Sequence, residues 1–209
     1  MAALLAVSAL AQKAPDNAPP ASSNATPNPW EFSLTTSGFI VPRGESYVSP
    51  DFSADHGWLH LEARYNDEAL KTGSLWVGYN FNVGKKLVVN ATPMVGGVFG
   101  NLNGIAPGCA LALTLTYKRI QLYGSAEYVF DLQNRSNNFF YIWDQVTYSP
   151  LHWLQVGLVS QRTRVYQTGL DVQRGVLAGI IYKKVNVAAN VFNFGWTTPT
   201  VVLALGFNF

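Results

Sequence analysis

Residues 199–209 read PTVVLALGFNF, and this stretch decides how the rest of the chain is interpreted. Large apolar side chains occupy every odd position from Val201 to Phe209, whereas the even positions hold smaller or polar residues such as Ala204 and Asn208. An alternation with a period of two residues predicts a β-strand with two different faces. A strand whose larger face is wholly apolar and ends on an aromatic residue is expected where lipid covers that face.

This ending resembles the C-terminal strand of bacterial outer-membrane β-barrel proteins, in which the terminal Phe is read by the barrel-assembly machinery. The resemblance covers residues 199–209 and places Phe209 at the position of that terminal aromatic residue. It implies a bacterial outer-membrane location, a lipid bilayer around the barrel, and the assembly machinery as a partner through the last strand.

The composition agrees with a membrane barrel. The chain has 209 residues, of which 48% are hydrophobic and only 12% are charged, whereas about 25% are charged in ordinary globular domains. Beyond the N-terminus no apolar run approaches the 18 or so residues that a membrane helix needs. The net charge of +2 gives no indication of nucleic acid as a partner, and the single Cys109 excludes an intrachain disulfide.

Three segments follow from composition. Residues 1–11 are expected to be the remnant of a signal peptide, because Ala9-Leu10-Ala11 has the small-x-small form of a cleavage site; an ordinary disordered tail is the alternative. Residues 12–28, rich in Pro, Ala and Asn, are expected to form a disordered linker. Residues 29–209 are expected to form the outer-membrane β-barrel.

Alternating segments and turn signals follow each other throughout residues 29–209, which predicts an all-β transmembrane antiparallel up-and-down β-barrel. Pro50 weakens the second expected strand, so ten strands are the alternative to twelve. The twelve expected strands are 30–41, 46–54, 58–66, 73–83, 87–99, 109–118, 119–130, 139–148, 152–163, 174–183, 184–194 and 200–209.

The aromatic residues next to turns predict which ends of the strands lie together. Tyr117, Tyr148 and Tyr182 each come just before a short turn, Phe81 precedes the turn at residues 84–86, and Phe209 ends the last strand. These side chains would form one interfacial girdle at the periplasmic rim, with the longer connections at the opposite rim. An even number of strands is then required.

The opposite face of each strand carries polar groups that are too numerous for a dry core, and a barrel of this width holds water. A soluble barrel with its apolar face turned inward is the alternative. Bulky inward residues, Trp76 among them, could fill the lumen. The lumen-lining candidates are Asp51, His60, Glu62, Arg64, Asn80, Gln121, Tyr123, Glu127, Tyr141, Trp143, Gln145, Gln155 and Gln161.

His60, Glu62 and Arg64 alternate along one strand and are expected to form an ion-pair network inside the barrel. A hydrolase would need a nucleophile such as Ser49 or Ser74 beside His60, and no nucleophile-elbow motif accompanies either serine. No spacing typical of metal ligands occurs. The sequence therefore predicts no catalytic residue, no metal site and no cofactor.

The predicted function is a narrow channel for passive diffusion or facilitated transport of small polar solutes, with weak ion selectivity because the lumen carries both signs of charge. Two alternatives remain: a structural membrane barrel with a plugged lumen, and an outer-membrane hydrolase that uses a lumen His. At the outer rim, Arg162 and Arg164 are candidates for contact with lipopolysaccharide phosphates.

Overall fold

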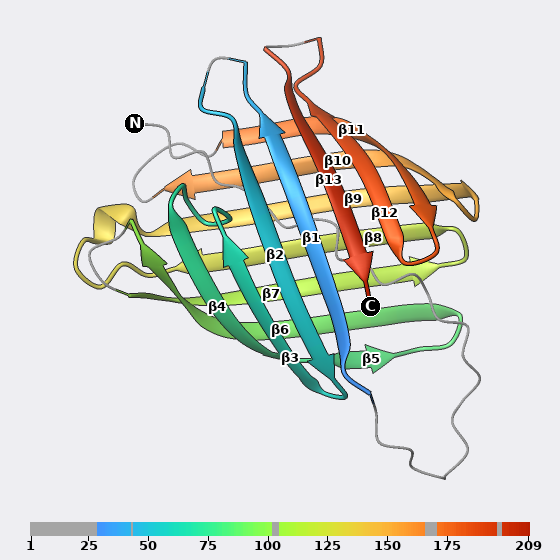
Figure 1. Cartoon of the computed structure of the whole chain (residues 1–209), viewed down its shortest axis with the longest axis horizontal. Helices are drawn as coiled ribbons and strands as arrows, with labels where there is room; N and C mark the ends of the chain where they lie inside the picture. The colour runs from blue at the N-terminus through green and yellow to red at the C-terminus, as the bar shows by residue number, and fades with distance from the viewer. Residues whose placement is uncertain (1–28, 43, 102–104, 166–170, 196–197) are drawn as a thin grey trace.

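The computed structural model describes residues 29–42, 44–101, 105–165, 171–195 and 198–209, without the side chains of residues 164 and 165. The expected signal-peptide remnant and linker at residues 1–28 lie outside this part. The described strands form one antiparallel sheet (Figure 1). They are β1 (Glu31–Ile40), β2 (Tyr47–His56), β3 (Leu59–Tyr65), β4 (Thr72–Tyr79), β5 (Phe81–Val83), β6 (Leu87–Gly100), β7 (Ala106–Tyr117), β8 (Ile120–Val129), β9 (Phe139–Leu151), β10 (Leu154–Val165), β11 (Asp171–Tyr182), β12 (Val185–Phe192) and β13 (Thr200–Asn208).

The sheet closes into a barrel. Except for β4 and β5, which both pair with β6 and not with each other, consecutive strands pair, and β1 pairs with β13. Because β4 and β5 follow each other along β6, the thirteen segments make twelve wall strands. At the seam, the Phe32 N–H donates to the Phe209 carbonyl at 3.1 Å, and the Phe209 N–H donates to the Phe32 carbonyl at 2.9 Å. The predicted twelve-stranded up-and-down barrel is confirmed, and the ten-stranded alternative is wrong.

The connections alternate in length around the barrel. Those at one rim, residues 57–58, 84–86, 118–119, 152–153 and 183–184, have two or three residues, and those at the other rim are longer. The short-turn rim also carries exposed Tyr117, Tyr148 and Tyr182. At two of these turns a lysine in the left-handed region lies over the preceding tyrosine ring, Lys118 at 5.2 Å and Lys183 at 5.4 Å. Short turns and an aromatic girdle are typical of the periplasmic rim, and we call the opposite end the outer rim.

The apolar faces of the strands point outward. In β13, Leu203 and Phe207 are exposed, whereas Val202 and Ala204, on either side of Leu203 in sequence, are 1% and 2% exposed. The same alternation places apolar side chains on the outside of every wall strand. This orientation rules out the soluble barrel, whose apolar face would turn inward. A closed sheet with this exterior satisfies its backbone hydrogen bonds internally and fits a lipid environment. None of the described helices is long and apolar enough to span a membrane.

Two prolines account for irregularities in the wall. The strand expected at residues 73–83 is divided at Asn80, and the break lies opposite Pro93, where pairing with β6 stops at Met94 and resumes at Ala91. Pro93 has no N–H to contribute to a ladder there. Pro50 is tolerated within β2 because the β2–β3 ladder begins one residue later, at Asp51.

One predicted turn is wrong. Residues 149–151 were expected to reverse the chain, but β9 continues through Pro150 to Leu151 and the reversal is at residues 152–153. Pro150 lies next to the end of β9, where its carbonyl accepts a hydrogen bond from Arg119 at 2.8 Å. A proline is compatible with a strand where the ladder does not need its N–H.

Candidate functional site in the barrel interior

All thirteen residues predicted to line the lumen are buried or half-buried. Twelve of them lie on inward-facing strand positions, and Asn80 lies in the break between β4 and β5. Fully buried are Asp51, Arg64, Glu127, Tyr141, Trp143, Gln145 and Gln161. Half-buried are His60, Glu62, Asn80, Gln121, Tyr123 and Gln155. The structure brings several of them into one charged network around Arg64, whereas Gln121 and Gln155 lie apart from it, near the periplasmic ends of β8 and β10. Their role in conduction stays a prediction.

Arg64, on β3, is the centre of the charged network. Its guanidinium makes a two-point contact with Glu62, through Nε at 2.7 Å and Nη2 at 3.1 Å. Nη1 donates to Glu127, across the interior on β8, at 2.8 Å, and to Asp67 at 3.3 Å, and lies 3.7 Å from a Glu68 oxygen. We call Arg64 with these four carboxylates the Arg64 cluster. A planar guanidinium with five N–H donors suits several carboxylates at once.

Asp67 and Glu68 were not expected in the interior. They belong to the connection between β3 and β4, which the sequence suggested was an outer loop, yet they are 4% and 0% exposed. The connection folds inward because Asn66 and Lys71 adopt the left-handed region, and the Asn66 side chain accepts from the Lys71 N–H at 2.7 Å. A polar Asn-Asp-Glu run carries no hydrophobic signal, so sequence patterning could not show that the loop turns into the barrel.

Trp76 supports the cluster from the wall. Its indole lies against β6 and β7 at positions where Gly96 and Gly108 leave room, since a Cβ at either glycine would come within 2.7 Å of the ring. The Arg64 guanidinium carbon lies 5.1 Å from the ring centre on the Trp76 side chain, a favourable cation–π geometry. The indole N–H points to Ser74 at 2.9 Å and to Glu68 at 3.2 Å. Gly96 and Gly108 therefore allow the Trp76 ring to lie against the wall, and the ring in turn positions the Arg64 guanidinium.

The cluster also has the composition of a metal site, but a guanidinium already lies within it. Oxygens of Asp67, Glu68 and Glu127 come within 4.8 Å of one another, which would suit a cation. The Arg64 Nη1 lies within 3.7 Å of a carboxylate oxygen from each of the three. Arg64 supplies the positive charge that an ion would bring, so the geometry is that of a buried ion-pair network.

Negative charge exceeds positive charge in this part of the interior. Six buried or half-buried carboxylates face Arg64 and the His60 imidazole among the described residues. Asp51 is one of them, because it lies directly opposite Arg64 in the β2–β3 register. The carboxylates are those of Asp51, Asp55, Glu62, Asp67, Glu68 and Glu127. An interior of this kind attracts cations and repels anions.

His60 extends the network toward the periplasmic rim. One ring nitrogen lies 2.8 Å from Asp55 and the other 3.2 Å from Glu62. Asp55 also accepts from the Asn80 amide at 2.6 Å, and Asn80 accepts from the Thr92 hydroxyl at 2.7 Å. The break at Asn80 in the wall thus places an amide inside the barrel, where it links the strands on either side of it.

The serines considered as nucleophiles are bonded elsewhere. The Ser49 hydroxyl donates to Asp67 and the Ser74 hydroxyl donates to Glu68. Both ring nitrogens of His60 already have carboxylate partners. A serine hydrolase needs its base within hydrogen-bonding reach of the nucleophile, and the recorded contacts of these residues do not provide that pairing.

Aromatic side chains fill the interior closer to the outer rim. Trp143 on β9 and Phe192 on β12 meet edge to face with ring centres 5.4 Å apart, although two strands separate them in the wall. Phe39 stacks on Tyr47 with ring centres 4.6 Å apart. We call Phe39, Tyr47, Tyr141, Trp143 and Phe192 the aromatic cluster; its members pack together as one hydrophobic core. Trp143 and Phe192 are 0% exposed, so the barrel is filled at this level.

The part of the wall formed by β11, β12 and β13 has small inward-facing residues. Gly179, Ala188, Ala204 and Gly206 face inward on β11, β12 and β13. Between this region and the aromatic cluster, the amide of Asn190 and the amide nitrogen of Gln145 are buried and have no hydrogen-bond partner among the described residues. Buried amides in proteins are satisfied by water when no protein group reaches them. The interior therefore includes buried amides that no described protein group satisfies, close in the chain to residues of the aromatic cluster.

Comparison with known proteins supports the fold. No protein-family model matches the chain, and no curated protein matches it significantly. Among solved structures, the NanC porin is similar with a TM-score of 0.56 at 12% identity, over 84% of this chain and 98% of that one. Acinetobacter baumannii outer membrane protein Omp33 matches with a TM-score of 0.46 at 12% identity, over 88% and 100% of the two chains. At this identity the likeness shows the barrel fold, and it confirms the predicted resemblance to bacterial outer-membrane β-barrels at that level.

Proposed function

We propose that this chain is a porin-like channel of the bacterial outer membrane that passes small polar solutes by passive diffusion and favours cations. The observation that carries the proposal is the contrast between the two sides of the wall: the outside is apolar, and the inside holds a network of carboxylates around Arg64. A lipid-facing barrel needs no charged interior to be stable in a membrane. The similar fold of the NanC porin supports the same function.

A preference for cations follows from the charge balance near Arg64. The six interior carboxylates outnumber the cationic side chains that face them. Walls of low dielectric strengthen the field of such a group of charges inside a narrow passage. The sequence predicted weak selectivity because both signs occur in the lumen, and the inward turn of Asp67 and Glu68 adds the negative charge that the sequence did not place there.

The aromatic cluster is expected to limit the flow. Replacing Trp143 with alanine removes the ring that meets Phe192 across the interior, so the variant should show a higher single-channel conductance in planar bilayers than the wild type. In a KCl gradient the reversal potential of both proteins should move toward the potassium equilibrium potential. Each variant is first checked for folding by its circular dichroism spectrum.

The matched control for this prediction is Trp153 to alanine, because Trp153 is an exposed tryptophan at the periplasmic rim. Conductance equal to the wild type is expected for it. A reversal potential that moves toward the chloride equilibrium potential would contradict the proposed charge preference while leaving the channel itself supported.

A second function, a structural barrel with a plugged lumen, is favoured by the complete burial of Trp143, Phe192 and Glu68. The conductance experiment separates the two. A scaffold would show no conductance in the wild type and none in the Trp143 variant. The other side chains of the aromatic cluster would still block the lumen after one ring is removed.

Recognition by the barrel-assembly machinery remains a proposal that depends on β13. The strand exposes Phe207 on its outer face, and Phe209 is exposed at the periplasmic rim beside the seam. Both aromatic rings are therefore on the surface where a membrane-embedded or periplasmic partner could contact them.

A further inference from the structure

One sector of the outer wall carries polar and charged side chains where the rest of the wall is apolar. Asp144 on β9, Ser160 on β10 and Arg174 on β11 lie in one row, because Ser160 pairs with both of the others. Arg162 follows two residues after Ser160 on the same face. All of them alternate with inward-facing residues such as Gln145 and Val159 and therefore point away from the barrel axis. Charged groups on a lipid-facing surface are unfavourable unless a partner compensates them.

Two of these charges compensate each other. Arg162 Nη2 lies 3.5 Å from a carboxylate oxygen of Asp144, and about half of each side chain is exposed. Arg174 is exposed, and no ion pair is recorded for it among the residues that the structure describes. The sector is thus left with one unneutralised guanidinium on the outer wall, beside the Ser160 hydroxyl.

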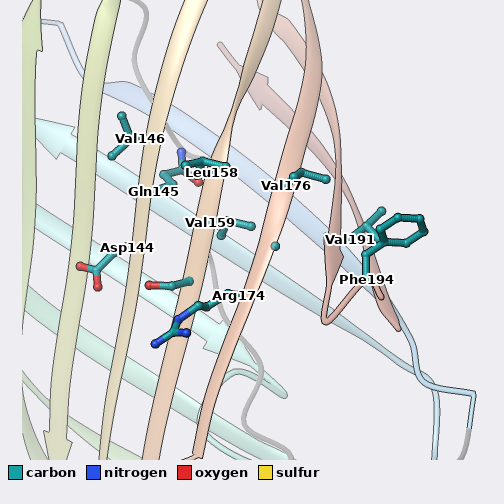
Figure 2. A pocket seen from close by; sticks show the side chains of 11 residues that line it. Asp144, Gln145, Val146, Leu158, Val159, Arg174, Val176, Val191 and Phe194 are labelled. Atoms are coloured by element: carbon teal, nitrogen blue, oxygen red, sulfur yellow. The ribbon is translucent and has the colours of Figure 1, made fainter. Parts of the chain in front are cut away.

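A hollow of about 440 Å³ in the wall adjoins this guanidinium (Figure 2). Figure 2 shows Val146, Leu158 and Val176 at one end and Asp144 and Arg174 at the other. Val191 and Phe194 form the side of the hollow toward β12. The hollow is therefore apolar over most of its length and charged at one end.

The charged end lies toward the outer rim. β11 runs from the outer rim to the periplasmic rim, so Arg174 precedes Val176 in that direction; β10 runs the other way, and Leu158 precedes Ser160. Leu158 and Val176 thus lie on the midplane side of Ser160 and Arg174, whereas Phe194 follows the outer end of β12. This is the order of groups in a lipid of the outer leaflet, whose head group is at the surface and whose acyl chains point to the midplane.

We propose that this hollow binds a lipid with a phosphate-bearing head group, one per barrel. The phosphate pairs with the Arg174 guanidinium and accepts a hydrogen bond from the Ser160 hydroxyl, and an acyl chain lies against Val146, Leu158 and Val176. Arginine suits phosphate because its planar fork can donate two parallel hydrogen bonds. Arg162 keeps Asp144 neutralised, so that the carboxylate does not repel the phosphate. This binding is independent of whether the barrel conducts.

The test uses the full-length barrel in a neutral detergent, with lipid binding measured by native mass spectrometry. The probes are diphosphorylated lipid A, the same lipid with its phosphates removed, and inorganic phosphate. Wild-type barrel should hold one lipid A molecule. Arg174 to glutamine should bind it at least about tenfold more weakly, because a charge-assisted contact is lost. Lys85 to glutamine, which removes the same charge from a periplasmic turn, should bind like the wild type.

A second pair of variants tests the apolar part. Leu158 to alanine should weaken lipid A binding, and Leu111 to alanine, which shortens another outward-facing leucine on β7, should not. Equal binding by the Arg174 and Lys85 variants would overturn the proposal, as would equal binding of the lipid without phosphates. Binding of inorganic phosphate with the affinity of lipid A would show an anion site without a lipid site. A lipid-free barrel that is dimeric in wild type and monomeric in the Arg174 variant would assign this sector to a second copy instead.

Discussion

Replacing Arg64 with methionine should lower the free energy of unfolding by about 3–5 kcal/mol, the usual cost of removing one partner from a buried ion pair. Arg64 is 7% exposed, and its guanidinium is shared by Glu62, Asp67, Glu68 and Glu127. Without it these carboxylates would face one another with no cation between them. The measurement is a urea titration of barrels folded into lipid vesicles, followed by tryptophan fluorescence.

Arg119 to methionine is the matched control for this experiment. Arg119 is exposed in the periplasmic turn at residues 118–119, and its Nη1 donates to the Pro150 carbonyl at 2.8 Å. A surface substitution of this kind is expected to change the free energy of unfolding by about 0.5 kcal/mol. Adding Glu127 to glutamine to the Arg64 variant should restore part of the stability, since one of the unpaired charges is removed. Equal losses for the Arg64 and Arg119 variants would show that the Arg64 cluster does not stabilise the barrel.

Leu113 to arginine should lower the free energy of unfolding by about 2–4 kcal/mol, as expected for a cation placed at the bilayer midplane. Leu113 lies in the middle of β7, on the same face as exposed Leu111 and Cys109, and its neighbours in register are Ala91 and Gly124. An arginine there would have apolar wall on every side and lipid in front of it. Reversible unfolding from vesicles measures the loss.

The depth of the substituted position decides the size of this effect, so the control is an arginine at the rim. Ile120 is the first residue of β8, is exposed, and is next to the periplasmic turn at residues 118–119. Ile120 to arginine should change the free energy of unfolding by only about 0–1 kcal/mol. If both substitutions cost the same, the assigned membrane level of the barrel would be wrong.

The fold could be predicted from the sequence because it depends on a local signal that repeats. Each strand shows its two faces by a period of two residues, and the lipid face is apolar in all of them. The tyrosines that directly precede short turns, Tyr117 and Tyr182, predicted the periplasmic rim from sequence spacing alone. The division at Asn80 was not predictable in this way, because it depends on Pro93, a residue on the neighbouring strand that is distant in sequence from the break.

The site was predictable only where it lies on strands. His60, Glu62, Arg64 and Glu127 are inward-facing strand positions, and alternation places them inside. The contacts among His60, Glu62 and Arg64 were predicted, because residues two apart on a strand lie close together. The contact of Arg64 with Glu127 could not be derived, because it depends on how the closed barrel is filled. Glu68 was missed because loops have no periodicity, and its inward position depends on the left-handed conformation of Asn66 and Lys71. The role of the outward-facing Arg174 was not predicted, because a single charged residue in an otherwise apolar strand does not by itself indicate a binding site.

The seam between β1 and β13 has a consequence for assembly. Every other neighbouring pair of wall strands is joined by a connection of a few residues, whereas Phe32 and Phe209 are brought together from opposite ends of the barrel sequence. Contacts between residues so far apart in sequence have the largest loop-closure entropy and form slowly. We therefore expect hairpins to form early and ring closure to be the slow step, leaving two unpaired strand edges for most of the folding time.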